Sequence, residues 1–585
     1  MLKLKHALAM SVVLMSTPAC QAENATPAAK TDSAASAAAI SDSADLIFTN
    51  GHFYTTDGWA KSIAVDDGVI VAISKTENLT DLKSSTTKVI DLAGDTVFPG
   101  LHDMHIHAMG SGQKAQSCSW PQGSSAEVAL ATIGECVAKA EKGEWVQGGQ
   151  WDSASFGQKP SRQMLDKLAP DNPVALTDIS YHSLWVNSKA LELAGITAET
   201  KTPEGGVIEK DENGQPTGIL RETATGLVRM VIPPPSEEDK AEALKWAIDL
   251  ISSYGITGFT DAGVSENELV TFTTLADRGD LKLRVRACQW GRGLVGVDSD
   301  EELDDALAKM RVNRNKFARD NIKPDCIKLA LDGVPTDGHT AAMLEPYQGA
   351  HNDAGHGDKG ITMIPQEKLN RILVKADNSG FTVKMHAAGD AAVRSAMDGI
   401  AATRKANGFS GNLHDIAHNS FVNMDDINRA RDIAATFEMS PYIWFPNPII
   451  PDIEKAVGKE RMKRWTPVKD AIDAGALVVP GSDWAVVPSV NPWLGIETLV
   501  TRQKPGGGGE MLGAVERITL KQAIDLYTVN AAKQMGTRDK TGAIAVGMLA
   551  DIIVLDRNPF DIPIYDVHNT QVKMSFIGGE KIYQQ

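Results

Sequence analysis

Two histidines one residue apart, His105 and His107, are the first residues in this sequence whose type and spacing favour chemistry. They end an apolar segment over residues 98–107, which reads as a β-strand. Side chains two apart share a strand face, so Asp103, His105 and His107 point to one side and His102 to the other. Paired imidazoles suit a borderline cation such as Zn²⁺, although such a pair also occurs on solvated surfaces.

Three later apolar segments end on the same residue types. His386 closes segment 382–386, His418 closes segment 415–418, and Asp483 follows the run at 478–482. In a closed parallel barrel the carboxyl ends of the strands converge on one rim, where active sites are built. Each residue alone is commonly a capping or packing residue, but their occurrence at successive strand ends predicts one shared site.

Lys328 lies in the apolar segment 326–333 and shares a strand face with Asp332. An ammonium group is no metal ligand, but its carbamate with CO₂ is an anion that can bridge two cations. The alternative from the residues alone is a buried ion pair between Lys328 and Asp332.

The elements that must position these residues alternate short strands with helical stretches, which predicts an α/β fold with a parallel sheet. Eight strands are the number that closes a (β/α)₈ TIM barrel. The candidate strands span residues 97–107, 258–260, 283–287, 326–331, 382–386, 415–418, 434–439 and 477–483.

Both ends of the chain have short β patterns separated by turn signals. We expect residues 45–98 and 540–585 to form one small composite β-sandwich domain. The barrel then occupies 99–539, with an insertion at about 110–250 that contains a hairpin over 205–220.

The first residues have the pattern of a processing signal. A basic start and a short apolar run predict a signal peptide over 1–22, followed by a flexible linker over 23–44. Cleavage after Ala22 is favoured over lipidation of Cys20, because residues 17–19 match a lipobox poorly. We therefore expect an exported protein, periplasmic or secreted, in which Cys118 and Cys136 either pair or stay buried thiols.

Composition limits the partners. The formal net charge is −17 over 585 residues, which argues against nucleic acid and against anionic membrane surfaces. We expect a small-molecule substrate, with a homodimer as one option for assembly.

The segments described above, together with 149–152, 182–188, 527–532 and 550–556, resemble amidohydrolase family 3. This is the branch of the metal-dependent amidohydrolase superfamily that includes N-substituted formamide deformylase, and the resemblance runs from about residue 45 to the end. It implies that His105 and His107 bind one metal and that His386 and His418 bind a second. It also implies a carboxylated Lys328 bridging them, and Asp483 as ligand and general base. The cofactor would be one or two divalent metals, with Zn²⁺ expected.

The expected reaction is hydrolysis of a non-peptide C–N bond in an amide, formamide or cyclic amide by a metal-activated water. His182 is a candidate donor to the carbonyl oxygen. The candidate substrate contacts are Trp151, Asp152, Trp185 and Asp332. Core packing is the alternative for the two tryptophans.

Two other functions compete. One is an exported N-acyl amino acid deacetylase or dipeptidase, for which Arg221, Arg286 or Arg394 could hold a substrate carboxylate. The other, of a different class, is a binding protein that keeps a metal centre without turnover. A complete ligand set that includes Asp483 argues against the binding protein.

Overall fold

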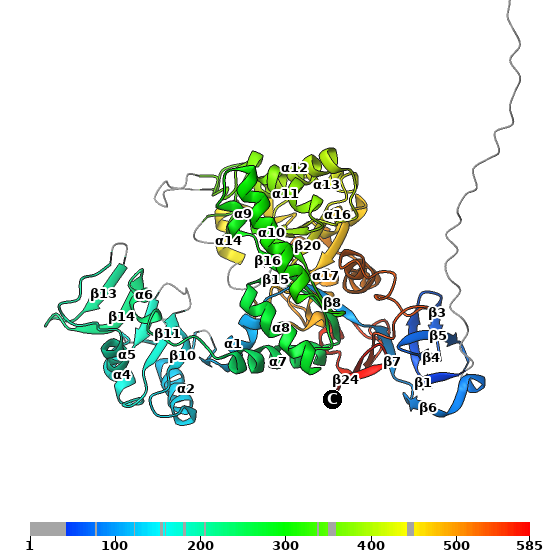
Figure 1. The fold of residues 1–585 in the computed structure, drawn as a ribbon, viewed down its shortest axis with the longest axis horizontal. Coiled ribbons are helices and arrows are strands. Elements are labelled where there is room, and N and C mark those ends of the chain that lie inside the picture. Colours follow the sequence, from blue (N-terminus) through cyan, green and yellow to red (C-terminus); the bar gives the residue numbers. More distant parts are fainter. Residues whose placement is uncertain are drawn as a thin grey trace, which may run out of the picture. The chain divides into compact units, whose positions relative to one another are not determined.

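The computed structural model describes residues 43–585 except 77–78, 122, 152–155, 158, 179–182, 204–205, 336–338, 349–357 and 442–449. Its centre is an eight-stranded parallel sheet (Figure 1). The strands, in the order in which they pair, are β8 (Leu101–Ile106), β15 (Ile256–Val264), β16 (Arg284–Trp290), β17 (Ile322–Ala330), β18 (Thr382–Ala387), β19 (Asp415–His418), β20 (Thr436–Met439) and β21 (Leu477–Pro480). The predicted α/β barrel with eight strands is confirmed.

The ring of strands nearly closes between β8 and the segment after β21. Ile106 forms a parallel bridge with Trp484, and the backbone N–H of Asp483 donates to the carbonyl of His105 at 2.8 Å. The N–H of His107 donates to the carbonyl of Trp484 at 2.6 Å. The closing contacts therefore bring the histidine strand and the Asp483 segment together.

Amphipathic helices follow the barrel strands and bury their apolar faces on the sheet. Three of these helices begin with a capping box at Ser236, Ser265 and Ser299. In each, the serine side chain accepts the backbone N–H three residues later, and the acidic side chain at that position accepts the backbone N–H of the serine. The longer ones are α7 (Glu237–Ser253), α8 (Glu266–Arg278), α10 (Asp300–Phe317), α11 (Gln366–Asn378), α12 (Asp390–Asn407) and α17 (Pro492–Thr501). Shorter ones include α1 (Ala108–Gln116), α13 (Met424–Arg429), α14 (Ile450–Val457), α15 (Lys459–Met462), α16 (Val468–Asp473) and α18 (Leu520–Asp525).

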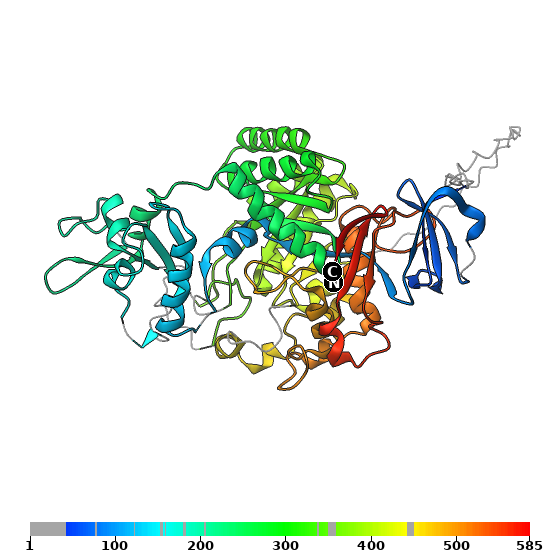
Figure 2. The ribbon, with the colours of Figure 1, turned by 90° about the horizontal axis from the view of Figure 1, so that it is seen from below.

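The two ends of the chain meet in two packed sheets, of which the first is built from N-terminal strands alone and the second from strands of both ends. One has the order β5-β4-β1-β6, and the other has the order β24-β23-β22-β7-β2-β3. The C-terminal strand β22 pairs antiparallel with the N-terminal strand β7, so red and blue segments lie side by side (Figure 2). One apolar cluster joins the two sheets and includes Phe48, Ile63, Val97, Ile552 and Phe576. The strands are β1 (Ala44–Thr49), β2 (His52–Thr55), β3 (Gly58–Ala60), β4 (Ser62–Asp66), β5 (Val69–Ser74), β6 (Lys83–Asp91), β7 (Thr96–Pro99), β22 (Ile552–Leu555), β23 (Val572–Ile577) and β24 (Glu580–Gln584).

The segment predicted as one strand over 97–107 is divided at Gly100, which is a correction. Residues before it form β7 of the terminal sheet, and residues after it form β8 of the barrel. A side chain at Gly100 would lie 2.2 Å from the hydroxyl of Thr257, so the backbone can pass from one sheet to the other only without a Cβ.

Residues 118–222 form a separate six-stranded sheet of order β13-β14-β12-β11-β10-β9. The hairpin predicted around 205–220 is present as β13 and β14. Cys118 on β9 and Cys136 on α2 (Ala126–Lys139) form a disulfide, which settles the choice left open by the sequence. The strands are β9 (Cys118–Ser119), β10 (Val146–Trp151), β11 (Val174–Asp178), β12 (Ser183–Val186), β13 (Gly206–Lys210) and β14 (Pro216–Glu222). The remaining helices of this region are α4 (Arg162–Asp166), α5 (Ser188–Leu193) and α6 (Thr225–Arg229).

A second disulfide joins Cys288 on β16 to Cys326 on β17, which face each other in the parallel register. No pattern in the sequence indicates this pairing, because it depends on the register of two strands and joins cysteines 38 residues apart. Among the described residues, no helix is both long and apolar enough to cross a membrane.

Candidate metal centre

His105, His107 and Asp483 converge at the carboxyl ends of the first and last barrel strands. Their nearest ligand atoms all lie within 4.8 Å of one another. The Oδ1 atom of Asp483 is 3.6 Å from Nε2 of His105 and 3.5 Å from Nε2 of His107. The sequence predicted that these three residues would meet, and the structure brings them together.

Local backbone features place these three side chains. His107 stands at the position before helix α1, where the strand has ended. Asp483 has a positive φ of 61°, which turns its carboxylate toward β8. A side chain at Gly481 would lie 2.5 Å from Cβ of His105 and 2.4 Å from Oε1 of Glu438, so only glycine lets the strand pass this closely.

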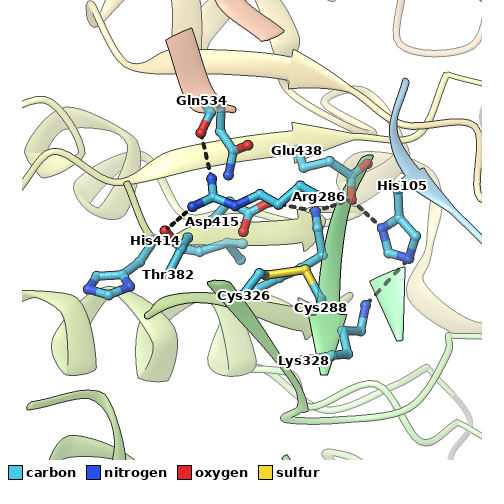
Figure 3. Close-up of polar contacts among 12 residues, drawn as sticks. His105, Arg286, Cys288, Cys326, Lys328, Thr382, His414, Asp415, Glu438 and Gln534 are labelled. Atoms are coloured by element: carbon cyan, nitrogen blue, oxygen red, sulfur yellow. Dashed lines mark hydrogen bonds and ion pairs between the residues drawn. A yellow bond between two sulfur atoms is a disulfide. The ribbon is translucent and has the colours of Figure 1, made fainter. Parts of the chain in front are cut away.

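Glu438 on β20 orients the ring of His105 (Figure 3). Its Oε2 atom lies 2.6 Å from Nδ1 of His105, and both side chains are fully buried. When Glu438 is ionised, Nδ1–H donates to it and the lone pair of Nε2 is left facing His107 and Asp483. Burial raises the pKa of Glu438 above its usual value, while the ammonium of Lys384, 3.7 Å away, opposes that rise.

Lys328 lies beside His105, with its Nζ atom 3.4 Å from Nε2 of the histidine. Burial, followed by repulsion from Lys384, lowers the pKa of Lys328 to about 8. The alternative of a Lys328–Asp332 ion pair is wrong, because no such pair occurs among the described residues. The strand β17 has ended at Ala330, and the carboxylate of Asp332 is turned to backbone amides instead.

Asp332 organises the loops above the barrel. It accepts the backbone N–H groups of Ala342 at 2.9 Å, Ala388 at 3.0 Å and Gly389 at 2.8 Å. Burial raises the pKa of Asp332 to about 7. These three amides engage both oxygens of the Asp332 carboxylate. No observation tests the predicted contact of Asp332 with substrate, which stays a prediction.

His386 and His418 stand beside the first three donors. Their ring centroids are 4.4 Å apart, and Nδ1 of His418 lies 3.9 Å from Oδ2 of Asp483. Nε2 of His386 is 3.0 Å from the carbonyl of Gly333. Burial lowers the pKa of His386 to about 4 and that of His418 well below its usual value. Both imidazoles are therefore neutral near pH 7, the form that binds metals.

The donor set fits a divalent metal. The buried His105 offers Nε2 with Nδ1 held by Glu438, and the carboxylate of Asp483 faces two imidazole nitrogens. Burial, and then the charge of Lys328, lowers the pKa of His105 well below its usual value, so it too is neutral. Imidazole and carboxylate at one point match the ligands of catalytic zinc sites. His105, His107 and Asp483 therefore form a cluster that could hold a metal ion, and Lys328, His386 and His418 lie adjacent to it.

A cavity of about 580 Å³ opens beside His107. Its lining comes from helix α1, from strands β10 and β11, and from the residues after Asp483. Neither Trp151 nor Trp185 lines it. The ring centroids of the two indoles are 6.5 Å apart in an apolar cluster. The indole N–H of Trp151 donates to the carbonyl of Leu176, and that of Trp185 donates to the carbonyl of Ser161. Both tryptophans therefore correspond to the core-packing alternative.

Two predicted residues, Asp152 and His182, lie outside the described residues. The three arginines proposed for a substrate carboxylate have other partners. Arg221 contacts Ser183 and Glu209, Arg286 binds Asp325, the carbonyl of Gln534 and Thr382, and Arg394 pairs with Asp426.

Several residues near the site were not predicted. Glu438, Lys384 and Asp415 form a fully buried chain of charges beneath His105, in which Lys384 donates to Asp415. Asp103 accepts the backbone N–H groups of His105 and Ser482, which ties β8 to the Asp483 segment. A charged residue inside an apolar strand, such as Glu438 in Thr436–Met439, was the available signal.

The same fold occurs in solved metal-dependent hydrolases. An uncharacterized one from Pyrococcus horikoshii matches with a TM-score of 0.71 and 25% identity, over 89% of this chain and 99% of the other. One from Pyrococcus furiosus matches with a TM-score of 0.69 and 23% identity, over 88% and 100% of the two chains. The fold is thus that of the barrel hydrolases that use metal ions.

Residues 88–583 match the model of the amidohydrolase family. The Bacillus subtilis protein YtcJ, which is named as an amidohydrolase, is 31% identical over 90% of this chain and 96% of its own. The N-substituted formamide deformylase of Arthrobacter pascens is 26% identical over 92% of this chain and 98% of its own. The chain belongs to the amidohydrolase family, which confirms the resemblance found in the sequence.

Proposed function

We propose that this protein hydrolyses a C–N bond in an amide-like substrate, such as an amide, formamide or cyclic amide. The observation that carries the proposal is the convergence of His105, His107 and Asp483 beside a cavity. A bound Zn²⁺ or similar ion would polarise the substrate carbonyl and lower the pKa of water.

Two side chains of the protein would transfer the proton and orient a metal ligand. The carboxylate of Asp483 would take a proton from the attacking water, a role supported by its position 3.6 Å from Nε2 of His105 and 3.5 Å from Nε2 of His107. It would then return that proton to the leaving nitrogen. Glu438 would keep His105 in the tautomer whose Nε2 faces the site.

A second cation would be held by His386 and His418, with a carboxylated Lys328 between the two ions. The low pKa of Lys328, about 8, supports this, because a larger share of its amine is neutral at pH 7 than in an exposed lysine. The neutral amine is the form that adds to CO₂. We expect a mass increase of about 44 Da on Lys328, the mass of one CO₂, in native mass spectrometry, lost at low pH.

The test of the activity is a substrate panel run on metal-free and zinc-loaded protein. Formamides, N-acyl amino acids and cyclic amides are compared, and release of the amine or acid is measured. The proposal predicts zinc-dependent turnover of at least one class. Zinc binding at the site without turnover of any class would favour the non-catalytic binding protein instead.

We also propose that the protein acts outside the cytoplasm. The two disulfides, Cys118–Cys136 and Cys288–Cys326, support an oxidising compartment, where such bonds persist. Fractionation of the producing cells tests this, and recovery of the mature chain in the cytoplasm with all four thiols free would contradict it.

A further inference from the structure

The cavity beside the metal site contains one lysine, Lys114, on helix α1. We propose that the ammonium of Lys114 binds a carboxylate of the substrate, so that the substrate is an anionic amide of the N-acyl amino acid type. This inference rests on the proposed hydrolysis and narrows its substrate class.

Helix α1 presents His107 and Lys114 to the same cavity. The lining residues His107, Gly110 and Lys114 have the spacing i, i+3 and i+7, which is one face of an α-helix. Seven residues correspond to two turns, or ~10 Å along the axis. Because a lysine side chain is long and flexible, its ammonium can approach a small ligand whose carbonyl lies at the metal site.

The opposite face of α1 is fixed. Ala108, Met109 and Ser111 are buried, and Gly112 approaches helix α7 so closely that a Cβ there would lie 1.9 Å from the carbonyl of Ala243. The helix therefore cannot rotate on its axis without clashing with α7. Lys114 is held on the cavity side by this packing.

The ammonium of Lys114 is close to the segment that carries Asp483. Its Nζ atom lies 3.5 Å from the carbonyl of Ala485, a long contact, and Ala485 is two residues beyond Asp483. Two residues of chain span at most ~7 Å. The Lys114 ammonium is therefore near enough to the Asp483 segment to contact a carboxylate on a substrate whose amide lies at the metal site, as in an N-acyl amino acid.

Lys114 forms no ion pair with any carboxylate within the described part of the chain. This distinguishes it from the three arginines, each of which contacts an acidic side chain of the protein itself. The lining also contains one carboxylate, that of Asp178, whose Oδ1 accepts the backbone N–H of Ser183 at 2.9 Å. Gln113, Gln147 and Gln150 add neutral polar groups. The half-buried lysine is thus the positive group available to an incoming anion.

The experiment compares an N-acyl amino acid with its C-terminal carboxamide, which has the same shape but no charge. Steady-state KM and kcat are measured on the zinc-loaded full chain for wild type, Lys114→Met and Lys114→Arg. Lys459→Met is the matched control, because that lysine is 86% exposed and does not line the cavity. Binding of both compounds is measured in parallel by titration calorimetry.

We expect wild type and Lys459→Met to favour the acid by about ten- to a hundredfold in KM, the size of one charged hydrogen bond. Lys114→Met should reduce this ratio to near one by raising KM for the acid, with a smaller change in kcat. Lys114→Arg should keep most of the preference. Equal effects of Lys114→Met on acid and amide would overturn the inference, as would a wild type without preference for the acid.

The two proposals fail in different ways. In one outcome, the acid binds in a way that depends on Lys114 but neither compound is turned over. This outcome would support the carboxylate-binding role of Lys114 and reject the proposed hydrolysis. Zinc-dependent turnover of the carboxamide, with no preference for the acid, would support the hydrolysis and reject the role of Lys114.

Discussion

Two histidines lie at opposite ends of the same barrel strand, and they have opposite surroundings. His414 precedes β19 at its amino end, and His418 closes it at its carboxyl end. Both are buried, and burial lowers the pKa of both. Residue type, burial and the direction of the pKa shift therefore do not distinguish the histidine beside the candidate metal site from the histidine at the other end of the strand.

The hydrogen bonds do separate them. Nδ1 of His414 accepts the backbone N–H of Val383 at 3.0 Å, and Nε2 lies 3.1 Å from Oδ1 of Asp377. Asp377 in turn accepts from three further side chains, those of Asn407, Ser410 and Asn412. Both nitrogens of His414 are thus engaged by the protein.

His418 has a different environment. Its Nδ1 lies 3.3 Å from the hydroxyl of Ser440, and Oδ2 of Asp483 is 3.9 Å from the same nitrogen. Its backbone has a positive φ of 78°, which carries the ring toward His105 and His386. At the carboxyl end of the strand, the side chain of His418 therefore lies beside other candidate metal ligands. At the amino end, both ring nitrogens of His414 are hydrogen-bonded within the protein.

Replacing the carboxylate at the rim should have the largest effect. Asp483→Asn is expected to lower kcat by about a thousandfold, because a proton acceptor and a metal ligand are lost together. Asp377→Asn is the matched variant at the amino end and should keep kcat per folded molecule near wild type. Similar losses of kcat in both variants would remove the distinction between the two ends.

The histidine pair tests the same contrast within one strand. His418→Asn should lower kcat/KM at least about tenfold while the thermal unfolding midpoint stays near that of wild type. His414→Asn should lower the unfolding midpoint and leave kcat/KM of the folded protein near wild type. Circular dichroism and zinc-loaded kinetics on both variants check the result, and the reverse pattern would contradict the account.

Loss of Asp377 should destabilise the fold. Asp377→Ala leaves His414 and three polar side chains without their shared acceptor, which costs about 3 kcal/mol in the free energy of unfolding. Denaturant unfolding of wild type and variant measures the difference. A change below about 0.5 kcal/mol would mean that the cluster contributes little to stability.

The pH dependence of stability should show a smaller effect. Burial lowers the pKa of His414, so the unfolded chain binds its proton first, and stability falls as pH drops below the unfolded value of about 6.5. For Asp377, burial raises the pKa, but the hydrogen bonds from His414, Ser410, Asn407 and Asn412 outweigh it and leave the pKa low. Its contribution is present above about pH 4 and is lost below.

The measurement is the slope of unfolding free energy against pH between 5 and 6.5. His414→Asn should reduce that slope, by at most about 1.4 kcal/mol per pH unit for one group. An unchanged slope would show that His414 titrates alike in the folded and unfolded chain.

The sequence predicted the barrel well because each strand is a short apolar run bounded by helices or turns. It also singled out His418, because that residue closes the apolar run at 415–418. Gly100 was missed as a boundary because the strands on its two sides join different sheets, which depends on contact with Thr257. The partnership of Glu438 with His105 joins residues 333 positions apart, and no local pattern indicates it.

The most direct test is the number of zinc ions per chain in wild type, His107→Ala and His414→Asn after dialysis against dilute zinc. We expect at least one zinc ion per chain in wild type and in His414→Asn, and a clear loss of zinc in His107→Ala, measured by atomic emission. Equal zinc in all three proteins, or none in wild type, would contradict a metal site built by His105, His107 and Asp483.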